Sequence, residues 1–294
     1  MIAIECKDVT KEFGAETALS NVSFQMEEGS IYALLGRNGA GKTTLMNCLC
    51  TRYLPDSGEI RILEEPVYEN EKVLREICFM SDHVDAFELK SVKAILTFAS
   101  NFYENWNNEL MERLLKMFEI KWKALYSKLS KGQKTGLGIL IGLCSNCRIV
   151  LFDEIYSGLD AVARQRFYEL LLEEQEKAPR TFVLSTHLIE EMTGLFTHVL
   201  MLDYGSVILC DDMETIYSRS FKCIGRTDKA DCLKNKHVLC KKEMGALTEY
   251  DIYDPITRQE YKELEEEGFR IASLPLQELF IAHTMHLEEE YGWN

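Results

Sequence analysis

The segment GRNGAGKTT, residues 36–44, limits the possible folds of this 294-residue chain more than any other stretch. It follows the apolar run Ile31–Leu35 and precedes a helical pattern that begins at Leu45. A G-x-x-x-x-G-K-[ST] pattern between a strand and a helix is typical of a phosphate-binding loop, whose glycines let successive amides face phosphate oxygens. The positive end of the helix adds to this attraction. We therefore expect a nucleoside triphosphate here, with Lys42 at its β- and γ-phosphates.

A second apolar strand is predicted at Ile149–Phe152, and it ends in the acidic pair Asp153 and Glu154. Continuous apolarity indicates a central strand of a parallel sheet, and ligands bind at the carboxyl ends of such strands. Asp153 is then placed to hold Mg²⁺ together with the hydroxyl of Thr43, and Glu154 is placed to polarise an attacking water. Kinases, GTPases, helicases and transport ATPases all remain compatible with these two features.

A capping pattern, LSKGQ at residues 129–133, precedes a long apolar helix. Ser130 and Gln133 have the spacing of a capping box, in which each side chain satisfies a backbone donor of the other residue. The cap does not explain Gly132, because glycine in a helix costs about 1 kcal/mol relative to alanine. We expect something to approach this helix end so closely that a side chain would interfere.

The composition excludes several classes of protein. The 33 basic and 48 acidic residues give a formal net charge of −15. The sequence shows no basic face that would compensate for this charge, so we do not expect a nucleic-acid-binding surface. Cys144 and Cys147 form a C-x-x-C without a second pair at zinc-site spacing, so the ten cysteines are interpreted as reduced thiols. The longest apolar run, Gly136–Cys144, is shorter than the roughly 20 residues that cross a bilayer. With no signal peptide recognised, we expect a cytoplasmic protein.

Two further motifs narrow the choice of family. SGLD, residues 157–160, follows Glu154, and His187 follows a predicted strand at Thr181–Ser185. Together with the phosphate loop, LSKGQ and the acidic pair, and in this order, the motifs resemble those of the nucleotide-binding subunit of an ATP-binding cassette (ABC) transporter. LSKGQ resembles the LSGGQ signature of that family, SGLD resembles its D-loop, and His187 resembles its switch histidine.

The resemblance covers about residues 1–215 and implies an α/β fold. It implies a P-loop NTPase (RecA-like) core with an antiparallel β subdomain, and an α-helical subdomain at about residues 83–145. In this family two copies close on ATP, and the signature helix of one copy points at the γ-phosphate bound by the other. The resemblance therefore implies that Gly132 is bare because phosphate oxygens approach it.

The resemblance also assigns residues to roles. ATP and Mg²⁺ are the implied cofactors, and the implied catalytic residues are Glu154, His187 and Lys42. The implied metal ligands are Thr43, Asp153 and Asp82. The implied nucleotide contacts are Phe13, Gly36, Arg37, Asn38, Gly39, Ala40, Gly41, Lys42, Thr43, Thr44, Ser130, Gly132, Gln133 and Asp160.

Some of these positions allow another interpretation or depart from the family pattern. Phe13 matches the aromatic residue that stacks on adenine, but a core aromatic at a strand end would fit the sequence too. Asp82 occupies the place of a family glutamine, and it is either a Mg²⁺ ligand or an ordinary turn residue. Lys131 replaces the first glycine of the signature pair, and Ile155–Tyr156 replace the more usual Pro-Thr.

Residues 216–294 lie beyond the cassette motifs and are predicted to form a small α+β extension. Weak alternation and a strand-like stretch at Glu243–Tyr253 are followed by an acidic helix near Tyr261–Glu267, and a last helix carries Pro275 in its first turn. Similar extensions ending in a motif like LQELFI occur on single-cassette ATPases of Gram-positive ABC-2-type peptide and antibiotic exporters, and the chain resembles these.

The expected function is that of an ATP-hydrolysing motor subunit, peripheral on the inner face of the cell membrane. Its expected partners are a second copy of itself and an integral membrane permease that binds a groove near Asp82. The chief alternative is a soluble ABC ATPase that acts on ribosomes or DNA. Ribosomal types carry two cassettes, and DNA-repair types insert a long coiled coil, whereas this sequence has one cassette and no coiled coil.

Overall fold

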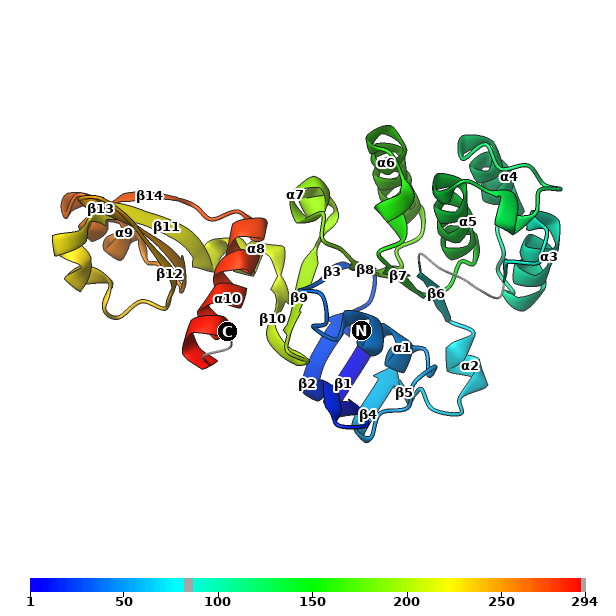
Figure 1. Ribbon diagram of the computed structural model, residues 1–294, viewed down its shortest axis with the longest axis horizontal. Helices are drawn as coiled ribbons and strands as arrows, with labels where there is room; N and C mark the ends of the chain where they lie inside the picture. Colours follow the sequence, from blue (N-terminus) through cyan, green and yellow to red (C-terminus); the bar gives the residue numbers. More distant parts are fainter. Residues whose placement is uncertain (82–86, 292–294) are drawn as a thin grey trace. The chain divides into compact units, whose positions relative to one another are not determined.

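The computed structural model describes residues 1–81 and 87–291 (Figure 1). The chain forms two compact units. Unit 1 consists of residues 1–187 and 195–207, and unit 2 consists of residues 188–194 and 208–294. The sequence placed the division at residues 215 and 216. The structure places it earlier and groups 188–194 with the second unit, because α7 (Ile189–Met192) packs against α10 (Leu276–Tyr291).

A parallel sheet forms the centre of unit 1, with the strand order β9-β3-β8-β7-β6. Every residue of β7 and β8 is buried, as expected for central strands covered on both faces. Figure 1 shows α1 (Lys42–Leu49) and α6 (Ala161–Lys177) on opposite sides of this sheet. The strands are β3 (Ile31–Gly36), β6 (Ile77–Ser81), β7 (Ile149–Asp153), β8 (Thr181–Ser185) and β9 (His198–Asp203).

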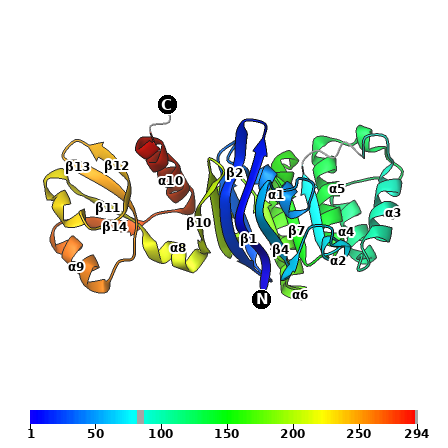
Figure 2. The same ribbon diagram turned by 90° about the horizontal axis from the view of Figure 1, so that it is seen from below.

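An antiparallel sheet with the order β2-β1-β4-β5 completes the β part of unit 1 (Figure 2). Buried and exposed residues alternate along the second half of β2, so one face of the strand packs inward. β1 ends at Phe13, and a turn with Gly14 at φ +64° leads into β2. The strands are β1 (Ile2–Phe13), β2 (Glu16–Glu27), β4 (Ser57–Ile62) and β5 (Glu65–Pro66).

The predicted helical subdomain is present, with α3 (Val92–Phe102), α4 (Asn108–Met117) and α5 (Lys131–Cys144) following a short α2 (Glu71–Leu74). Its helices begin at residues whose side chains accept a hydrogen bond from the first turn, such as Ser91 before α3 and Asn107 before α4. The later part of α5, from Thr135 to Cys144, is buried throughout. Among the described residues, no helix is both long enough and apolar enough to span a membrane.

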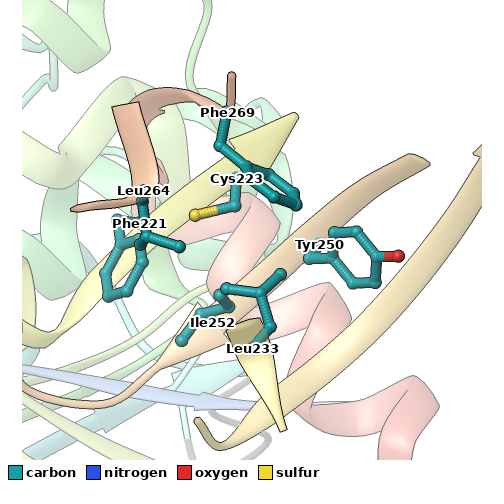
Figure 3. Close-up of a cluster of buried hydrophobic side chains, with 7 residues drawn as sticks. All are labelled: Phe221, Cys223, Leu233, Tyr250, Ile252, Leu264 and Phe269. Atoms are coloured by element: carbon teal, nitrogen blue, oxygen red, sulfur yellow. The ribbon is translucent and has the colours of Figure 1, made fainter. Parts of the chain in front are cut away.

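Unit 2 has the predicted α+β character, with a sheet of order β12-β13-β11-β14. Figure 3 shows its apolar core, in which Phe221, Leu264 and Phe269 pack with Cys223, Leu233, Tyr250 and Ile252. Pro275 immediately precedes α10 and its carbonyl accepts a hydrogen bond from Leu279, so the prediction that it lies inside the first turn is off by one residue. The other elements of this unit are α8 (Met213–Arg219), β11 (Ser220–Arg226), β12 (Val238–Met244), β13 (Leu247–Tyr253), α9 (Arg258–Glu266) and β14 (Arg270–Ser273). The strand β10 (Ser206–Asp212) begins in unit 1, in the sheet that contains β9, and ends in unit 2.

All ten cysteines are free thiols, as the sequence predicted. Cys144 and Cys147 are both buried. Burial is the main cause that raises the pKa of each thiol above its usual range, so both stay protonated near neutral pH. They therefore act as small apolar side chains of the core.

Close packing at the glycines of α5 generates a stability prediction. A Cβ at Gly142 would lie 2.4 Å from Cε1 of the buried Phe152 ring. Gly142→Ala should therefore lower the free energy of unfolding by about 1–3 kcal/mol, although alanine favours helix formation by about 1 kcal/mol. The control is Gly194→Ala, because a Cβ there meets nothing within 4 Å. Urea unfolding of both variants measures the difference, and equal stability would contradict the packing account.

Candidate functional site

A cavity of about 600 Å³ lies at the carboxyl end of β3 and β7. Its floor is the glycine-rich loop between β3 and α1, and acidic side chains that follow β7 form another wall. The lining residues are Phe13, Glu16, Ala18, Asn38, Gly39, Ala40, Gly41, Lys42, Thr43, Thr44, Ser81, Asp153 and Glu154. The structure thus brings the two motifs together that the sequence separates by about a hundred residues.

The glycines of the loop serve different purposes. Gly39 and Gly41 have φ values of +83° and +97°, a region that residues with a side chain rarely adopt. A Cβ at Gly36 would lie 2.6 Å from the Leu202 carbonyl oxygen, and a Cβ at Gly41 would lie 2.6 Å from that of Ala18. Close packing within the chain therefore requires glycine at positions 36 and 41, and backbone conformation requires Gly39.

Lys42 projects back over the loop that precedes it. Its Nζ donates hydrogen bonds to the carbonyl oxygens of Gly36 at 2.7 Å and Arg37 at 3.0 Å. Burial lowers the pKa of Lys42, while the carboxylates of Glu154 and Asp153 oppose this effect. The ammonium group is thus held inside the cavity, where a bound anion could contact it directly.

Thr43 and Asp153 provide a pair of oxygen atoms suited to a hard cation. The Thr43 hydroxyl donates to Asp153 Oδ2 at 2.7 Å, and Asp153 is buried. Hydroxyl and carboxylate oxygens are the donor types that Mg²⁺ prefers, and Mg²⁺ takes its other ligands from water and phosphate. The described residues contain no group of three or more His, Cys, Asp or Glu side chains that could hold a metal alone. The donor set therefore fits a Mg²⁺ that is shared with a nucleotide.

Glu154 and His187 lie at the ends of neighbouring strands. His187 Nδ1 is 3.9 Å from Glu154 Oε2, and both side chains reach solvent. Glu154 adopts φ +50°, which turns the chain sharply away from β7, and its carboxylate lines the cavity. A carboxylate at this place can orient a water molecule toward a bound phosphate.

Phe13 lies at the rim of the cavity, and 45% of its surface is exposed. Its ring meets Tyr53 edge-on at 5.3 Å between centroids, and Lys11 Nζ lies 5.4 Å from its centre. This exposure rules out the interpretation of Phe13 as a core aromatic. An exposed ring beside a phosphate-binding loop can stack on a flat base.

The signature residues lie at a second cavity of about 430 Å³, which shares no lining residue with the first. The capping box is present, because Gln133 N donates to Ser130 Oγ at 3.2 Å and Ser130 N donates to Gln133 Oε1 at 3.1 Å. Asp160 caps α6 by accepting a hydrogen bond from Ala163 N at 2.8 Å. This second cavity is lined by Met117, Phe118, Glu119, Ser130, Gly132, Gln133, Gly158, Leu159, Asp160, Val162, Ala163 and Arg166.

Gly132 has a neighbour within the same chain. A Cβ at this position would lie 3.2 Å from the carbonyl oxygen of Gly158, which is closer than most such contacts. The tight approach of the D-loop turn therefore supplies an intrachain reason for a residue without a side chain. It adds to the expected approach of a ligand, since Gly132 also lines the second cavity.

The sequence did not identify several residues of the cavity wall. Glu16 and Ala18 follow the turn after Phe13, and Ser81 ends β6. These residues are ordinary in type and belong to no motif, so only the approach of their strands reveals them. Asp82, the predicted metal ligand next to Ser81, lies outside the described residues.

Comparisons with known proteins agree with the motifs. A family profile described as "ABC transporter" matches residues 19–157, and a profile described as "AAA domain, putative AbiEii toxin, Type IV TA system" matches residues 123–193. An ABC transporter ATP-binding protein of Methanocaldococcus jannaschii, MJ1023, is 32% identical over 221 residues, 72% of this chain and 79% of that protein.

Two relatives align with most of the chain. The ABC transporter ATP-binding protein YtrB of Bacillus subtilis is 24% identical over 285 residues, 95% of this chain and 97% of YtrB. The bacitracin transport ATP-binding protein BcrA of Bacillus licheniformis is 25% identical over 268 residues, 90% of this chain and 87% of BcrA. Alignments of this length extend into unit 2.

Solved structures have the same fold. The ATP binding subunit of an ABC transporter superimposes with a TM-score of 0.66 at 25% identity, over 73% of this chain and 91% of that chain. A nucleotide-free ATP-binding cassette from an ABC transporter superimposes with a TM-score of 0.61 at 20% identity, over 73% of this chain and 93% of that chain. The second comparison supports the fold alone.

The position of Glu154 generates a prediction. Glu154→Gln keeps the size of the side chain and removes the base, so ATP should still bind while its hydrolysis slows by at least about 100-fold. Steady-state phosphate release and fluorescent ATP binding measure the two quantities. Glu190→Gln, at an exposed carboxylate, is the matched control and should hydrolyse ATP normally. Turnover of Glu154→Gln at the wild-type rate would show that Glu154 is not the base.

Proposed function

Because this chain belongs to the family of ABC transporter ATP-binding proteins, which hydrolyse ATP to power transport, we propose that two copies of it close on ATP and drive a separate membrane permease. We further propose that this permease exports peptides or antibiotics. The chain would then lie at the inner face of the cell membrane, with its permease bound in a groove near Asp82.

The separation of the two cavities is the observation that carries the proposed dimer. The phosphate loop lines one cavity, whereas Ser130, Gly132 and Gln133 line the other. Among the described residues, the lining of the first cavity includes the phosphate loop but none of the signature residues, whereas the second has the N-terminus of α5 and a serine hydroxyl without a phosphate loop. A second copy, facing the first, supplies what each cavity lacks, so each complete site contains residues of both chains.

Residues in and beside the first cavity have separate tasks in the proposed mechanism. The loop amides and Lys42 hold the β- and γ-phosphates, and Phe13 stacks on adenine. Thr43, Asp153 and the proposed ligand Asp82 would hold Mg²⁺, which would supply positive charge to offset that of the phosphates. Glu154 accepts the proton of the attacking water, and His187 lies beside Glu154, where it can contact the γ-phosphate.

The partner copy has its own proposed tasks. Ser130, Gly132 and Gln133 lie at the positive end of α5, which favours an anion such as the γ-phosphate. Asp160 is the last residue of the D-loop motif and would lie near the opposite phosphate loop. Because these groups come from the other chain, hydrolysis requires closure of the dimer.

The proposal of an exporter rests on the relatives that share the second unit. The alignments with YtrB and BcrA cover 285 and 268 residues, more than the cassette of about 215 residues alone. The name of BcrA describes bacitracin transport. We extend this to the chain as a substrate class, peptides or antibiotics, which would pass through the permease.

The composite site generates a complementation prediction. Lys42→Ala damages the phosphate loop, and Ser130→Arg damages the signature end of α5. A heterodimer of the two variants has one intact composite site and one doubly damaged site. Mixing the two inactive proteins should therefore restore up to about half of the ATPase activity per heterodimer, measured by phosphate release at increasing ratios of one variant to the other.

The control mixes Lys42→Ala with a Lys42→Ala, Ser130→Arg double variant, because no pairing of these chains has an intact site. This mixture should stay inactive. Heterodimers that form, as shown by pull-down of differently tagged chains, but that remain inactive would contradict a site shared between two copies.

A further inference from the structure

The carbonyl oxygen of Ser185 lies where the turn that follows Glu154 contacts the end of β8, the strand that leads to His187. It accepts a hydrogen bond from Glu154 N at 3.3 Å and a second one from the hydroxyl of Tyr156. Ser185 and Tyr156 are both completely buried. The backbone of Glu154 and the side chain two residues later thus bind the same atom, two residues before His187.

The turn that follows Glu154 needs to be held in place. Glu154 has φ +50°, a conformation that is unfavourable for a residue with a side chain unless its surroundings enforce it. The 3-10 turn η3 (Ile155–Gly158) then begins, with Ser157 N donating to the Glu154 carbonyl at 3.1 Å. The direction of the Glu154 carboxylate depends on this turn.

Two neighbouring side chains connect the turn to two different elements. Ile155 packs against α5, where Gly138 leaves room for it, since a Cβ at Gly138 would lie 2.5 Å from Ile155 Cδ1. The hydroxyl of Tyr156 bonds to Ser185, the last residue of β8. A hydroxyl on a long rigid side chain can span this distance, whereas a short side chain at position 156 could not.

We propose that Tyr156 is a positioning residue for ATP hydrolysis. Through the carbonyl of Ser185, it fixes the position of Glu154 relative to the switch histidine His187. Tyr156 lines neither cavity and does not touch the nucleotide site. It acts through Glu154, so the inference rests on the proposed role of that residue as the base.

The hydroxyl of Tyr156 is suited to a permanent link. Burial raises the pKa of Tyr156 well above its usual value, although a hydrogen bond from the Thr186 side chain opposes this. The hydroxyl therefore stays protonated near neutral pH and can donate its hydrogen bond there. Thr186 lies between Ser185 and His187, so both hydrogen bonds of Tyr156 end next to the histidine.

The first test is Tyr156→Phe, which keeps the ring and removes only the hydroxyl. We expect kcat for ATP hydrolysis to fall about tenfold, the effect of one lost hydrogen bond, while the Kd for ATP stays unchanged. Tyr168→Phe is the matched control, since Tyr168 is buried on α6 and lines neither cavity. It should keep the wild-type kcat. A normal kcat in Tyr156→Phe would overturn the inference.

The second test asks whether Tyr156 acts through Glu154. In a Glu154→Gln background the residual hydrolysis no longer needs the carboxylate, so adding Tyr156→Phe should slow it no further. A further tenfold loss in this background would mean that Tyr156 supports the fold of the site in general, and it would overturn the inference.

The same pair of variants separates the two levels of the proposal. Slow Glu154→Gln together with a normal Tyr156→Phe leaves the base assigned and rejects only the positioning role. Normal turnover in Glu154→Gln rejects the base itself. Should Tyr156→Phe fold poorly by thermal melting, Thr186→Val removes the other hydrogen bond of Tyr156 and should lower kcat in the same direction without changing the Kd for ATP.

Discussion

Parallel pairing of β3, β8 and β7 is the constraint on which the nucleotide site depends. Ser185 is paired with Leu34 on one side and with Asp153 on the other. This register makes three strands end at the same edge of the sheet, so the residues that follow them meet. The phosphate loop, the acidic pair and His187 are far apart in the sequence and adjacent at this edge. A shift of one residue in any of the three strands would separate them.

The glycines of α5 extend this constraint to the signature end. Positions 132, 138 and 142 approach the Gly158 carbonyl, the Ile155 side chain and the Phe152 ring, with hypothetical Cβ distances of 3.2, 2.5 and 2.4 Å. At these glycines the backbone of the helix therefore packs directly against β7 and the turn that follows Glu154. Because cores packed this closely transmit displacement, the signature end and the catalytic turn of one chain should move as one body. In the proposed dimer those two parts serve different sites.

Unit 2 is held together by its own core and its own charges. Lys222 on β11 pairs with Glu249 at 2.9 Å and with Glu278, which ties α10 to the sheet. Asp251 is the third carboxylate near Lys222, at 3.6 Å, and burial raises its pKa despite the lysine. The short helix α7 belongs to this unit and begins two residues after His187.

The sequence by itself determined the family, the strand–loop–helix context of Lys42 and the capping box at Ser130, because each depends on residues close together in the chain. It also predicted the α+β character of the extension. Only the tertiary structure decided that Phe13 is exposed at the cavity rim, that Gly132 has the Gly158 carbonyl as a neighbour, and that the signature and the phosphate loop line separate cavities. Tyr156 was visible as a departure from the family pattern, but its partner was not. Its hydrogen bond joins the turn after β7 to the end of β8, 29 positions apart, and such a contact follows from strand register, which local patterns do not specify.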